Sequence, residues 1–80
     1  NFSLYPNPND GNFTIKLNTS STKNITIKVT DLRGTEVYLN SFRNNGFFNE
    51  NIQLKNIQNG VYLININDGI NNMTRKIIIK

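Results

Sequence analysis

The side chains that could catalyse a reaction are few in this sequence of 80 residues, and they lack partners. Nucleophilic catalysis needs a hydroxyl or thiol beside a general base, but the chain contains no His and no Cys. Four of the five carboxylates lie in or beside predicted turns, where acidic side chains have ordinary solvated roles. We therefore expect no catalytic residue and no enzyme. The hydroxyl and carboxyl groups considered are those of Ser3, Ser20, Ser21, Ser41, Asp10, Asp31, Glu36, Glu50 and Asp68.

Two short segments have the composition of a cation-binding loop, Asn9-Asp10-Gly11 and Asn67-Asp68-Gly69. Neither has the spacing of a calcium loop, because residues without a suitable oxygen ligand occupy the early ligand positions. These residues are Pro6 and Pro8 in the first segment and Ile64 and Ile66 in the second. A tight turn is the better interpretation of both segments. We expect no metal ion and no cofactor.

The basic residues fall into two groups. Lys16 and Lys28 alternate with apolar residues and are typical of a solvated sheet face. Arg75, Lys76 and Lys80 instead surround three consecutive isoleucines at the end of the chain. Such a strand could simply close a sheet, or it could pair with the sheet edge of another protein. A formal net charge of +4 is too small to indicate a nucleic-acid partner, and no apolar run is long enough for direct membrane insertion.

Apolar residues at alternate positions predict β-strands. The chain contains 17 Asn and 11 Ile but no Ala, which disfavours helices. Turn residues separate about seven short strands; Asp31 and Gly34, for example, predict a type I turn at residues 31–34. We therefore expect an all-β fold, a single antiparallel β-sandwich of immunoglobulin-like type. The stretch 61–66 is apolar on both faces and predicts a central strand. The predicted core is Phe13, Ile15, Ile25, Ile27, Val29, Val37, Ile52, Leu54, Tyr62, Ile64 and Ile77.

Tyr5-Pro6-Asn7-Pro8 is the most distinctive segment. Each proline fixes its own φ and disfavours the helical region for the preceding residue, so the segment predicts a stiff, extended entry. Asp10-Gly11 then predicts a tight turn that leads into the strand at Phe13.

In order and spacing, the sequence resembles the C-terminal sorting domains of the type IX (Por) secretion system. The resemblance starts at Tyr5-Pro6-Asn7-Pro8 and covers nearly the whole chain; only Asn71-Asn72-Met73 departs from the usual lead into the last strand. The other matching residues are Gly11, Phe13, Thr14, Ile15, Val29, Asp31, Gly34, Val37, Ile52, Leu54, Ile57, Gly60, Tyr62 and Lys76 before an aliphatic end at Lys80.

The resemblance implies that residues 1–80 are the sorting domain of a longer exported cargo protein. An outer-membrane translocon and its β-barrel shuttle protein would recognise the domain in the periplasm of a Gram-negative bacterium. The cargo would then be released, or a cysteine sortase would cut upstream of residue 1 and attach it to the cell surface. We expect the domain to be a monomer.

The resemblance also assigns roles to individual residues. Translocon recognition is expected at Gly60, Tyr62, Lys76, Ile77, Ile78, Ile79 and Lys80, with the last strand offered to the shuttle for backbone pairing. The structural family motif consists of Tyr5, Pro6, Asn7, Pro8, Gly11, Asp31 and Gly34.

An alternative function is a carbohydrate- or protein-binding module of a cell-surface protein. This function would need an exposed aromatic platform. Its candidate residues are Tyr38, Phe42, Phe47 and Phe48, of which Phe47-Phe48 is better explained as a loop anchor that packs on the core.

Overall fold

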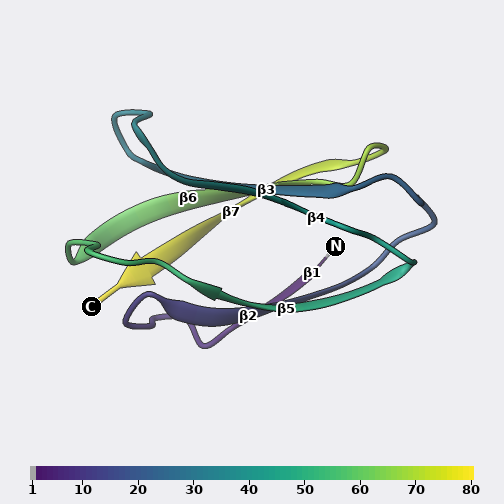
Figure 1. The fold of residues 1–80 in the computed structure, drawn as a ribbon. Coiled ribbons are helices and arrows are strands. Elements are labelled where there is room, and N and C mark those ends of the chain that lie inside the picture. Colours follow the sequence, from purple (N-terminus) through teal and green to yellow (C-terminus); the bar gives the residue numbers. More distant parts are fainter. Residues whose placement is uncertain (1) are drawn as a thin grey trace.

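The computed structural model describes residues 2–80, and seven antiparallel strands account for most of them (Figure 1). No helix in this part of the chain is long and apolar enough to cross a membrane. The strands are β1 (Phe2–Tyr5), β2 (Asn12–Asn18), β3 (Ile25–Asp31), β4 (Glu36–Phe42), β5 (Phe47–Gln53), β6 (Gly60–Asn67) and β7 (Asn72–Ile79).

The strands form two facing sheets, one with the order β1-β2-β5 and one with the order β4-β3-β6-β7. This arrangement confirms the predicted seven-strand β-sandwich. In a constant-type immunoglobulin domain the fourth strand lies beside the fifth, whereas here β4 pairs with β3. The central position predicted for residues 61–66 is also confirmed, because β6 lies between β3 and β7.

Alternation along the strands builds the core between the two sheets. On β2 and β3, every second residue is an aliphatic or aromatic side chain that points inward and is buried. All predicted core residues except Val37 are buried. The complete set of buried hydrophobic residues is Phe2, Phe13, Ile15, Leu17, Ile25, Ile27, Val29, Phe48, Ile52, Leu54, Tyr62, Ile64, Ile66, Ile77 and Ile79.

The prediction that Val37 belongs to the core is wrong: its side chain is 41% exposed. Val29 pairs with Tyr38, and the next residue, Thr30, pairs with Glu36, so Val37 is the extra residue of a β-bulge. Tyr38 and Phe42 of β4 face the core instead, because they pair with the inward residues Val29 and Ile25, and Val37 lies on the outward face. The outer face of β6 is likewise less buried than its sequence suggests, since Leu63 is 37% exposed.

A buried carboxylate ties together the connections at one end of the sandwich. Asp68, which is only 1% exposed, accepts hydrogen bonds from the backbone N–H groups of Asn71 (2.6 Å) and Ile70 (2.9 Å) and from the Thr19 hydroxyl (2.7 Å). The hydrogen bond from the Asn71 N–H is the largest influence that lowers the pKa of Asp68, followed by the hydroxyl of Thr19. Among residues 2–80, no cluster of acidic side chains could hold a metal ion.

The core assignment predicts a large difference between two aliphatic substitutions. Ile27→Ala removes a side chain that is 0% exposed, and we expect it to lower the free energy of unfolding by roughly 2–5 kcal/mol. That loss is a large share of the roughly 5–15 kcal/mol that stabilises a typical domain, so much of this variant should be unfolded. Val37→Ala, at an exposed position, should cost less than about 1 kcal/mol. Urea unfolding measures both, and equal losses would contradict the assignment.

The buried carboxylate predicts a loss of stability in acid. The folded state holds the pKa of Asp68 below its ordinary value of 3.8, so its contribution to stability is present above that pH. The contribution is lost as the pH falls through the lower pKa of the folded state. Urea unfolding from pH 7 to pH 2 should show a steeper acid loss for the wild-type chain than for Asp68→Asn. Identical slopes would show that the charge of Asp68 contributes nothing.

Candidate functional site

The residues of the family motif and those assigned to translocon recognition, although distant along the chain, lie at one end of the sandwich (Figure 1). We call this region the motif end and define it as residues 5–11, 31–35, 58–62 and 76–80. Strand register brings them together, because Asp31 pairs with Tyr62 and Gly60 pairs with Ile79. The β1–β2 connection, the β3–β4 hairpin and the C-terminus all lie at this end, on the left in Figure 1.

The last five residues, which we call the tail (residues 76–80), have two different faces. Ile77 and Ile79 point inward and are 0% and 2% exposed, opposite Tyr62 and Gly60 of β6. Lys76 and Lys80 are exposed, and Ile78 is half-buried. The tail is therefore part of the core on one face and presents two cations around one aliphatic side chain on the other.

Residues 6–10 cross the outer edge of the tail, and we call them the strap. The amide of Asn7 accepts a hydrogen bond from the Ile78 N–H (3.0 Å) and donates one to the Lys76 carbonyl (3.3 Å). The backbone of Asn9 donates to the Ile78 carbonyl (3.0 Å) and accepts from the Lys80 N–H (2.8 Å). The prediction of a stiff extended entry is thus wrong: β1 pairs with β2 in a hairpin, and the intervening prolines lie in a connection that contacts β7.

Asn9 and Gly11 fix the path of the strap. Asn9 is 7% exposed, and its side-chain amide donates to the Pro6 carbonyl (2.9 Å) and accepts from the Gly11 N–H (2.8 Å). Gly11 has φ = +106°, and its carbonyl accepts a hydrogen bond from the Leu54 N–H (2.8 Å). A Cβ at this position would lie 2.9 Å from the Leu54 carbonyl oxygen. The position therefore requires glycine for both its backbone conformation and its close contact.

The turn predicted at residues 31–34 closes the β3–β4 hairpin. The Gly34 N–H donates to the Asp31 carbonyl (3.0 Å), and one oxygen of the Asp31 carboxylate accepts from the N–H groups of Thr35 and Arg33, each at 2.9 Å. The Thr35 N–H is the largest influence that lowers the pKa of Asp31; the Arg33 guanidinium, 3.1 Å away, acts in the same direction. Asp31 thus organises a turn.

Of the residues assigned to translocon recognition, Tyr62 has a role inside the domain. Its ring is buried, and its hydroxyl donates a hydrogen bond to the Gln58 carbonyl (2.7 Å). Tyr62 therefore supports the β5–β6 connection and lies opposite Ile77 on the inward face of the sheet. The outward side chains of the tail remain available to a partner. Sequence reasoning placed Asn9 in a tight turn but did not predict that its side chain would link the Pro6 carbonyl to the Gly11 N–H.

These features define a class: a small all-β domain whose sequence motifs and chain end meet at one surface. A family model described as the secretion system C-terminal sorting domain matches residues 3–80, so the chain belongs to this family. No curated protein matches the chain significantly. The chain is a non-catalytic sorting signal of the type IX secretion system, and it interacts with secretion machinery. A protein that carries it is secreted through the outer membrane or held at the cell surface.

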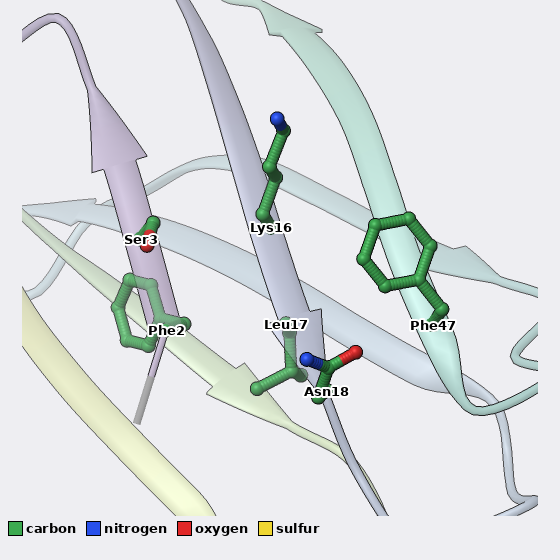
Figure 2. Close-up of a pocket in the computed structure, with 6 residues that line it drawn as sticks. All are labelled: Phe2, Ser3, Lys16, Leu17, Asn18 and Phe47. Atoms are coloured by element: carbon green, nitrogen blue, oxygen red, sulfur yellow. The ribbon is translucent and has the colours of Figure 1, made fainter.

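The structure does not gather the four aromatic residues of the alternative function into one platform. Phe48 is buried, and Phe42 packs edge-on against it with ring centroids 5.4 Å apart. Tyr38 packs against the core, and only Phe47, at 57% exposed, projects outward. Phe47 lines a groove of about 360 Å³ on the three-stranded sheet (Figure 2). The other lining residues are Phe2, Ser3, Lys16, Leu17 and Asn18.

Two glycines of the family motif provide a matched test of how the motif end is built. Gly34→Ala should cost about 1 kcal/mol, because its φ is +92° but a Cβ there meets nothing within 4 Å. Gly11→Ala should cost roughly 2–4 kcal/mol, because a similar backbone strain is joined by overlap with Leu54. Thermal and urea unfolding of both variants measure the difference. If the two losses were equal, the close contact at Gly11 would have no energetic importance.

Proposed function

We propose that the motif end is the surface by which the outer-membrane translocon and its β-barrel shuttle protein recognise the cargo. Residues 1–80 are, in this proposal, the last domain of a longer exported protein. The cargo passes through the periplasm and is then released, or is cut upstream of residue 1 by a cysteine sortase and attached to the surface. The observation that carries the proposal is that the family motif and the tail, far apart in sequence, form one continuous structure.

The position of the first strand supports this proposal. β1 begins at Phe2, which pairs with Leu17 close to the β2–β3 connection, and runs toward Tyr5 at the motif end. A passenger joined before β1 therefore attaches toward the opposite end of the sandwich. The motif end remains accessible whatever the passenger is.

The energetic cost of detaching the tail indicates that a partner recognises it while it is still paired in the sheet. Detaching the tail would expose Ile77 and Ile79, at roughly 1.5–3 kcal/mol for each side chain. It would also break the four hydrogen bonds to the strap. The total cost of detachment is comparable with the roughly 5–15 kcal/mol that stabilises a whole domain, so detaching the tail would unfold the domain.

The outward face of the tail indicates the chemistry of its partner. Lys76 and Lys80 flank Ile78, so a complementary surface would offer acidic groups around a shallow apolar pocket. Deleting the tail would not test this, because the deletion also removes core residues. Only substitutions of the outward side chains separate recognition from folding.

The proposal is tested with the chain fused behind a fluorescent protein in a host that has the secretion system. The double variant Lys76→Glu, Lys80→Glu should reduce export at least about tenfold, which corresponds to a loss of about 1.4 kcal/mol in docking. The matched control is Lys28→Glu, an exposed lysine on β3 of the same sheet, which should be exported like the wild type. Both variants should keep the wild-type melting temperature. Normal export of the double variant would overturn the proposal.

A further inference from the structure

The tail lies at the edge of a sheet, yet its outer backbone groups from the Lys76 carbonyl to the Lys80 N–H are already paired. β7 is the last strand of the four-stranded sheet, with β6 on its inner side. Backbone groups of alternate residues in such a strand point away from the neighbouring strand. In the tail, four of these groups bond to the strap: the carbonyls of Lys76 and Ile78 and the N–H groups of Ile78 and Lys80.

The side chain of Asn7 takes the place of a strand residue. A primary amide offers one carbonyl acceptor and an N–H donor, as a peptide unit does. The Asn7 amide uses them on the Ile78 N–H and the Lys76 carbonyl, which a neighbouring strand would otherwise bind. The backbone of Asn9 continues the pairing as an isolated parallel bridge opposite Ile79. Asn9 is in turn fixed by its own hydrogen bonds to Pro6 and Gly11.

We infer that the strap closes the tail edge against strand addition, so that secretion machinery meets a tail already paired on both sides. Strand addition needs a row of free N–H and C=O groups at a sheet edge, and the tail does not offer one while the strap is in place. The machinery then binds the outward side chains. Asn7 is a positioning residue that acts through the tail. This inference rests on the proposed function, because it specifies how the same surface is recognised.

The inference also assigns a protective role to the strap. An unpaired edge strand is a template for pairing with a second copy of the same chain. Closing it keeps the domain monomeric while the passenger is in transit. Opening the strap should therefore expose the edge and allow two copies to associate through β7.

The test compares Asn7→Ala with the wild-type chain by amide hydrogen exchange, sedimentation and export. Loss of the Asn7 amide should speed exchange of the Ile78 N–H by about tenfold, while amides on the β6–β7 ladder, such as that of Ile64, exchange as before. The variant should show concentration-dependent self-association. Export of the fluorescent fusion should fall, as it does for the charge-reversed tail.

Two further variants separate positioning from a general loss of stability. Asn7→Asp keeps an acceptor for the Ile78 N–H but has no donor for the Lys76 carbonyl, so it should restore much of the Ile78 protection and part of the export. Asn51→Ala removes a similar bond, from the Asn51 amide to the Phe13 carbonyl (3.2 Å), at a site away from the tail. It should leave Ile78 exchange and export unchanged.

Results that differ from these expectations would overturn either the inference or the proposed function. Unchanged Ile78 exchange in Asn7→Ala would show that the strap does not hold the edge. Faster exchange with unchanged or increased export would show that the machinery accepts, or needs, an open edge. Either result overturns the inference but leaves the proposed function standing, provided that the charge-reversed tail is still not exported. If the charge-reversed tail is exported normally, the proposed function itself fails.

Discussion

The hydrogen bonds between the strap and the edge of β7 join residues about 70 positions apart. The motif end depends on this pairing, because the backbone N–H and C=O groups along the outermost strands of an open sandwich need hydrogen-bond partners. Asn7 and Asn9 satisfy those groups where the chain ends. The family motif therefore has a structural explanation: its prolines, the Asn7 amide and Gly11 belong to the connecting segment that pairs with the last strand.

The other outermost strands are protected by different means. On β5, Glu50 lies opposite Ile15, and on β4, Asn40 lies opposite Ile27, so a polar residue takes an inward position at each of these edges. On the side formed by β1 and β7, the Arg75 guanidinium lies over the Phe2 ring, 4.0 Å from its centroid. Polar groups at inward edge positions discourage pairing with other chains. In this 80-residue domain, side chains at the sheet edges thus limit association with other chains.

Much of the fold follows from the sequence, because alternation along a strand and turn chemistry are local properties. Ile27 and the turn at Asp31 are positioned by their immediate neighbours, and both were predicted. Val37 was misplaced because both faces of β4 carry apolar residues, and alternation alone does not say that Tyr38 and Phe42, not Val37 and Leu39, take the inward face. The strap was missed for another reason. Local rules describe how Pro6 and Pro8 restrict their neighbours, but not which distant strand Asn7 contacts. The family resemblance identified both partners of that contact but not the contact itself.

In the proposed function the tail serves the fold and the sorting signal together, since Ile77 and Ile79 fill the core while Lys76, Ile78 and Lys80 face outward. A domain that has not folded therefore does not present a finished tail. If a passenger precedes β1, as the proposed function has it, the long axis of the sandwich, about 34 Å, separates this surface from the place where the passenger joins. One docking geometry can in consequence serve enzymes, adhesins or binding proteins of any shape, because the domain itself acts as a rigid spacer that keeps their bulk away from the membrane machinery.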